Sequence, residues 1–143
     1  MRTHVRFITA VASLFVLAVS SGARADTLQS KGRVPFAFTA GERAFAPGIC
    51  TVHRSDVSQG VLIVRNEKQA VLLLTQGASS TRLQDRPRLV FRRYGKRYFL
   101  REIWFAGSGG RLLPETRAER DEANVANRIA SRQSPETVEV TLD

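Results

Sequence analysis

Short apolar runs bounded by turn residues constrain the fold of this chain more than any other feature. Two of them, residues 61–64 and 70–74, are joined by the polar loop 65–69. Strands in globular domains are about four to eight residues long and helices about ten or more, so runs of this length favour a β-hairpin. Because neither run alternates with polar residues, we expect both faces of this hairpin to be covered, as in the core of a barrel or sandwich.

A further hairpin is predicted from residues 88–94 and 97–105, with Gly95 and Lys96 as a two-residue turn. Glycine at the first position of such a turn suits type II′. The resulting register puts five large side chains on one face: Leu89, Phe91, Tyr98, Leu100 and Trp104. The opposite face carries arginines together with apolar residues, and a neighbouring element is expected to cover its apolar positions.

Other strands are predicted at 33–39, after a polar leader at 26–32, and at 49–54. Residues 75–87 are predicted to form the longest loop, because polar and turn-forming residues fill them. Thr116 and Glu119 form a capping box, which predicts a helix over about residues 116–131. The tail 132–143 is expected to be flexible or weakly paired. The predicted fold is mainly β: a small antiparallel barrel-like or sandwich domain of about six to seven strands with one C-terminal α-helix.

The N-terminus has the pattern of a cleavable secretory signal peptide. Arg2 and Arg6 precede the uncharged stretch 7–20, and Ala23 and Ala25 provide an A-x-A cleavage site. The alternative is an uncleaved N-terminal anchor, for which the apolar stretch is short. We therefore expect a signal peptide at 1–25, a single β-rich domain at 26–143 without a transmembrane segment, and a periplasmic or extracellular location.

The chain is basic, with 22 Lys and Arg against 13 Asp and Glu, a net charge of +9. Three arginines leave with residues 1–25, so 19 basic and 13 acidic residues remain and the net charge becomes +6. Export argues against a nucleic-acid partner. The expected partners are an anionic lipid, an acidic glycan or an acidic protein.

Few residues suit catalysis or metal binding. Cys50 is the only cysteine, and it lies three residues from His53 in a predicted strand, where the two side chains point to opposite faces. We expect Cys50 to be a buried core residue, the alternatives being an intermolecular disulfide or a reactive thiol. Glu102, opposite Leu89 in the predicted register, is expected to pair with Arg93 or another arginine. No catalytic residue, metal site or cofactor is predicted.

The candidate binding residues are the arginines of the hairpin at 88–105, which are interleaved with aromatic residues. They are Arg88, Arg92, Arg93, Arg97 and Arg101. Arginine beside aromatic side chains is typical of phosphate and carboxylate recognition, which predicts an anion-binding surface. The alternative is a solvated face whose alkyl stems cover apolar surface.

The sequence also resembles a group of short exported bacterial proteins that is defined by a sequence pattern and has no known activity. The pattern spans roughly residues 33–120. Its landmarks here are 34–38, Pro47-Gly48, 60–62, 89–91, 98–100, Trp104 and 117–119. The resemblance implies an exported β domain and supplies no functional residue.

These features favour an exported, non-enzymatic protein, an envelope-associated or secreted module that binds an anionic partner through the arginine-rich hairpin. One alternative is a small barrel that carries an apolar ligand, motivated by the runs 61–64 and 70–74. The other is a hydrolase whose site would gather His53 or Glu102 with a serine.

Overall fold

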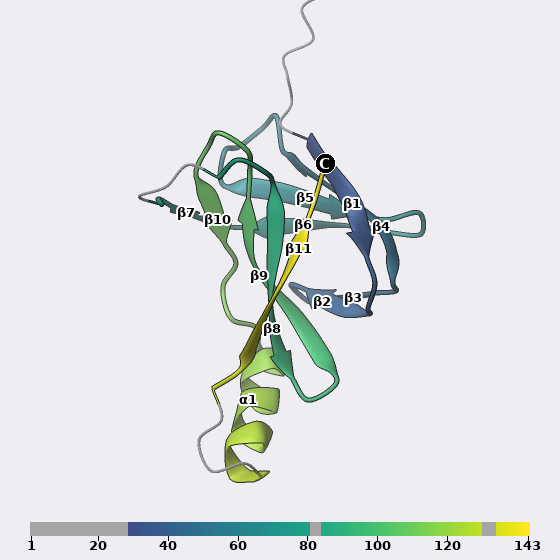
Figure 1. Cartoon of the computed structure of the whole chain (residues 1–143), viewed down its shortest axis with the longest axis vertical. Coiled ribbons are helices and arrows are strands. Elements are labelled where there is room, and N and C mark those ends of the chain that lie inside the picture. The colour runs from purple at the N-terminus through teal and green to yellow at the C-terminus, as the bar shows by residue number, and fades with distance from the viewer. Residues whose placement is uncertain (1–28, 81–83, 130–133) are drawn as a thin grey trace, which may run out of the picture.

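The computed structural model describes residues 29–80, 84–129 and 134–143, so the predicted signal peptide at 1–25 lies outside the described residues. Strands make up 52% of the structure, which confirms the mainly β prediction. They form two sheets, one of them curled like half a barrel, and one helix lies near the C-terminal end (Figure 1).

The smaller sheet is antiparallel, in the order β1-β4-β5-β6. Its strands are β1 (Gln29–Val34), β4 (Gly48–Arg54), β5 (Val61–Arg65) and β6 (Ala70–Leu74). The predicted hairpin of runs 61–64 and 70–74 is therefore confirmed as β5 and β6. Asn66 stabilises its turn, because its Oδ1 accepts hydrogen bonds from the backbone N–H groups of Lys68 and Gln69 at 3.0 and 2.9 Å.

Only one face of this hairpin is covered, so the prediction that both faces are buried is wrong. Leu62, Val64 and Leu73 point into the core, whereas Leu72 and Leu74 are 69% and 76% exposed on the outer face. Period-two alternation normally separates a buried face from a polar one, and here aliphatic residues occupy both. The residue types in β6 therefore do not distinguish the two faces.

The larger sheet has the order β11-β8-β9-β10-β7, with β2 and β3 attached beside β9. Its strands are β2 (Phe38–Ala40), β3 (Arg43–Phe45), β7 (Gln76–Ala78), β8 (Arg88–Tyr94), β9 (Arg97–Trp104), β10 (Gly110–Leu112) and β11 (Glu136–Thr141). The described residues thus contain eleven strands rather than six or seven. Four of them are only three residues long, too short to show a period, and β7 lies inside the predicted loop 75–87.

The β8–β9 hairpin begins in the predicted register and then departs from it. Pairing runs from Tyr94↔Arg97 to Phe91↔Leu100, and a bulge between Val90 and Phe91 then shifts it. Beyond the bulge, Leu89 faces Ile103, which is fully buried in the core. Trp104 belongs instead to the opposite face, contrary to the prediction, because one extra residue reverses the alternation. Gly95 has φ of 58°, the positive value expected for the turn.

The predicted strand 33–39 is divided between the two sheets. Val34 ends β1 and Phe38 begins β2, with Pro35, which has no N–H for a ladder, between them. Both Val34 and Phe38 are buried, so the alternation correctly predicted their common direction but not the break in the strand. The pairing of β1 with β4 also brings Gln29 into the sheet, which the prediction of a polar leader at 26–32 missed.

The C-terminal residues are a structural element of both sheets, not a flexible tail. The helix α1 (Arg117–Ile129) leads to β11, which pairs with β8 over six residues. Beyond β11, Leu142 is buried in the core, and Lys31 and Asp143 exchange two backbone hydrogen bonds of 3.0 and 2.8 Å. Figure 1 shows this end of the chain beside β1, so β11 joins the two sheets.

Candidate anion-binding site

Four of the five predicted anion-binding arginines form ion pairs within the chain. Their partners are carboxylates of α1 and β11. The pairs are Arg88–Glu139 at 3.2 Å, Arg93–Glu136 at 3.0 Å, Arg101–Glu119 at 3.1 Å, and Arg97–Glu122. The C-terminal segment therefore supplies an acidic partner for the arginine-rich hairpin.

The aromatic residues beside these arginines also contact them within the hairpin. The guanidinium carbon of Arg93 lies 5.6 Å from the ring centre of Tyr98, and that of Arg97 lies 5.4 Å from Phe99. Such contacts are cation–π interactions. Of the five arginines, Arg92 alone has neither an ion pair nor a cation–π contact within the described residues.

The Arg101–Glu119 pair is the most buried of the four. Glu119 is 1% exposed and also accepts a hydrogen bond from the Tyr94 hydroxyl at 3.4 Å. Burial raises the pKa of Glu119, and the nearby Arg101 guanidinium opposes that rise. The sequence assigned Glu119 to a capping box. Its backbone N–H does donate to the Thr116 hydroxyl at 3.2 Å, but its carboxylate points to Arg101.

Among the residues that the structure describes, no arginine forms an ion pair with Glu102, contrary to the prediction. Its carboxylate accepts a hydrogen bond from the indole N–H of Trp104 at 2.8 Å. The bulge that reverses the alternation in β9 moves Glu102 opposite Val90 rather than Leu89. Its nearest partner is therefore set by the same register shift that relocates Trp104.

Cys50 and His53 lie on opposite faces of β4, as predicted. Cys50 is 1% exposed, and burial raises the pKa of its thiol to about 11, so the reactive thiolate form is strongly disfavoured. His53 is half-buried on the outer face. Within the described residues, no three His, Cys, Asp or Glu side chains come close enough together to hold a metal ion.

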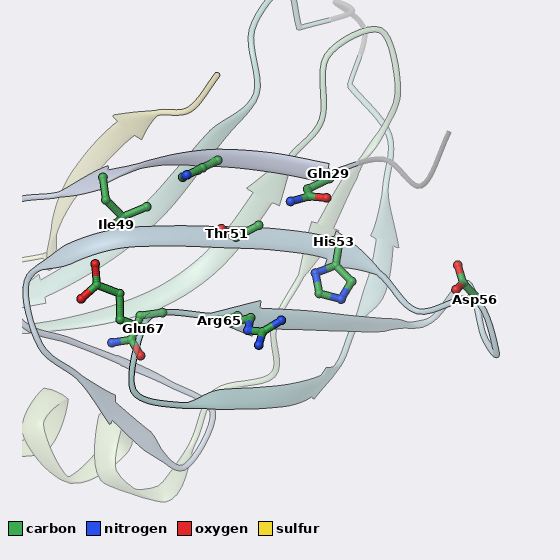
Figure 2. Close-up of a pocket in the computed structure, with 9 residues that line it drawn as sticks. Gln29, Ile49, Thr51, His53, Asp56, Arg65 and Glu67 are labelled. Carbon is green, nitrogen blue, oxygen red and sulfur yellow. The ribbon is translucent and has the colours of Figure 1, made fainter. Parts of the chain in front are cut away.

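The outer face of the smaller sheet carries an open groove of about 580 Å³, which the sequence did not indicate (Figure 2). Strands β1, β4 and β5 supply most of its lining. The lining residues are Gln29, Lys31, Ile49, Thr51, His53, Asp56, Arg65, Asn66 and Glu67. In Figure 2 the side chains of Thr51, His53 and Arg65 project from neighbouring strands on this face.

Lys31, Thr51 and Arg65 form a row across the groove, because the register pairs Lys31 with Thr51 and Thr51 with Arg65. Adjacent strands lie about 4.8 Å apart, so the backbone positions of Lys31 and Arg65 lie roughly 10 Å apart, with Thr51 between them. Neither Lys31 nor Arg65 has a carboxylate within 4.0 Å in the described part of the chain. Asp56 and Glu67 lie at the two ends of the groove (Figure 2).

This arrangement can bind an oxyanion. The two cations supply charge, the Thr51 hydroxyl supplies a hydrogen-bond donor, and neighbouring His53 supplies another. The sequence offered little indication of this groove, because its residues occupy alternate positions of three separate strands. Only the register between the strands shows that they are neighbours.

The fold and the groove define a small two-sheet β protein with an open, cation-bearing surface. No protein family model, curated protein or solved structure matches the chain. No helix in the described ranges is both long and apolar enough to cross a membrane.

Proposed function

We propose that this protein is an exported, non-enzymatic module that binds an anionic partner through the groove on its smaller sheet. The observation that carries the proposal is the row formed by Lys31, Thr51 and Arg65, whose two cations have no ion pair among the described residues. A surface cation without an internal carboxylate retains its capacity to bind an external anion. The basic balance of the chain adds a long-range attraction for such a partner.

The groove is favoured over the hairpin because of what each already contacts. Ion pairs within the chain engage Arg88, Arg93, Arg97 and Arg101, so an external anion would compete with a tethered carboxylate at each of them. A tethered partner has a high effective concentration, which a dilute ligand has to exceed. Among the described residues, no carboxylate forms an ion pair with Lys31 or Arg65, although Asp56 and Glu67 lie at the ends of the same groove.

The two alternative functions gain no specific support. Between the sheets, the core contains large buried side chains, among them Phe45, Phe91 and Phe105, where an apolar ligand would have to fit. The groove contains His53 but no serine, and Glu102 is not part of it. It therefore lacks the residues that the hydrolase alternative requires.

Titration with inorganic phosphate, followed by amide shifts in NMR spectra, tests the proposal. We expect saturable shifts at Thr51 and Arg65. The double variant Lys31→Ser/Arg65→Ser should weaken binding about tenfold or more, because two charged contacts are lost. Arg92→Ser is the matched control, since among the described residues Arg92 is the hairpin arginine without an ion pair within 4.0 Å. If Arg92→Ser weakens binding and the double variant does not, the hairpin is the site and the proposal fails.

A further inference from the structure

An exposed aliphatic patch lies on the same face of the smaller sheet as the groove. The register pairs Val61 with Leu74 and Ile63 with Leu72, so these four side chains form a two-by-two block on the outer face. Leu72 and Leu74 are 69% and 76% exposed, and Val61 and Ile63 beside them are half-buried. Contiguous exposed aliphatic residues on a folded domain mark an interaction surface.

The cationic row and the aliphatic patch are direct neighbours. One row across the sheet runs from Lys31 through Thr51 to Arg65, and the adjacent row runs from His53 through Ile63 to Leu72. Within one face, the chemistry therefore changes from cationic to aliphatic over a single row. A ligand that covers both halves needs an anionic group and a hydrocarbon group side by side.

We propose that this face docks on the surface of an anionic lipid bilayer. Leu72 and Leu74 enter the boundary between headgroups and acyl chains, while Lys31 and Arg65 contact lipid phosphates. The inference rests on the proposed function and names the partner of the same site. Aliphatic burial and electrostatic attraction add in such docking, and each is weak alone.

Charge favours a lipid surface over a second copy of this chain. Packing two copies face to face about a two-fold axis would bring the same cations, Lys31 and Arg65, into one interface. A bilayer presents anions there instead. Asp56 and Glu67 lie at the ends of the groove and oppose binding there, so the attraction depends on the central row.

Vesicle co-sedimentation tests the inference with the protein purified from a host that expresses the whole chain. The vesicles contain phosphatidylglycerol and phosphatidylethanolamine, and phosphatidylcholine vesicles serve as the neutral comparison. Leu72→Ser/Leu74→Ser should weaken binding to the anionic vesicles about tenfold or more. Val125→Ser/Ile129→Ser is the matched control, because these residues of α1 are 46% and 81% exposed. All variants share one N-terminal segment, so differences between them report on the mutated surfaces.

The outcomes separate this inference from the proposed function. If Leu72→Ser/Leu74→Ser loses vesicle binding and keeps the phosphate-induced shift at Thr51, both are supported. If the wild-type protein binds phosphate but not anionic vesicles, the proposed function stands and this inference falls. If Leu72→Ser/Leu74→Ser binds anionic vesicles as well as the wild type and the control Val125→Ser/Ile129→Ser do, the inference is also overturned. Sedimentation without lipid measures self-association of the protein. If Leu72→Ser/Leu74→Ser abolishes self-association and leaves vesicle binding intact, the patch binds a second copy of this chain and not a bilayer.

Discussion

Replacement of Glu119 by alanine should destabilise the domain far more than the same change at Glu122, although both carboxylates belong to α1 and pair with β9. Glu119 is 1% exposed and Arg101 18%, whereas Arg97, the partner of Glu122, is 52% exposed. Breaking a buried ion pair costs about 3–5 kcal/mol, and an exposed pair contributes about 0–1 kcal/mol.

The expected loss of stability for Glu119→Ala lies at or just below the lower end of the range for buried pairs. Arg101 keeps some access to water, and the raised pKa of Glu119 indicates that the desolvation of its carboxylate outweighs the attraction to Arg101. We expect a loss of about 2–3 kcal/mol in the free energy of unfolding, or a Tm lower by about 10 °C for a domain of this size. Glu122→Ala should lower Tm by less than about 4 °C.

Thermal and urea unfolding, followed by circular dichroism, measure both values. Equal losses in the two variants would refute the reasoning, because burial would then have no influence on the strength of the pair. The double variant Arg101→Leu/Glu119→Leu provides a further check, since removing both charges should cost less than removing Glu119 alone.

Three other predictions follow from the described contacts. Because the folded-state pKa of Glu119 is raised, the stability contributed by its protonated form should fall as pH rises from below its ordinary value of 4.5 through the raised value. Urea unfolding should show this fall in the wild type, and Glu119→Gln should lack that component. The Cys50 thiol should react with a disulfide reagent at least about a hundredfold more slowly in the folded protein than in urea, because it is buried and its pKa is about 11; equal rates would contradict this. Gly110→Ala should lower the free energy of unfolding by about 2 kcal/mol or more, because the added Cβ would lie 2.6 Å from the Trp104 ring, and an unchanged Tm would contradict it.

The sequence predicted the parts of the fold in which local patterns act alone. The hairpin of β5 and β6 and the turn at Gly95 follow from short apolar runs and from turn chemistry, and both are present. The helix α1 starts where the capping residue Thr116 predicts it. These features depend on residues close together in the chain, so one sequence is enough to predict them.

The features that the sequence did not predict depend on pairing between distant segments. The bulge beside Val90 has no residue signature, yet it reverses the directions of Ile103 and Trp104. Arg88 and Arg93 were predicted to bind an external anion, and their observed partners, Glu139 and Glu136, lie more than 40 residues away. Charge counting could indicate a cationic hairpin but not that the chain itself neutralises much of it.

The position of β11 has a consequence for how the domain folds. This strand pairs with β8 at the edge of the larger sheet, and Leu142 is buried in the core. Asp143 forms two backbone hydrogen bonds with Lys31 in the smaller sheet. A nascent chain that lacks the last few of these residues cannot close the contact between the two ends of the domain. Domains dominated by such long-range pairing fold slowly. For a protein that crosses a membrane before it folds, as our proposal of export requires, this late closure would keep the chain open during transit.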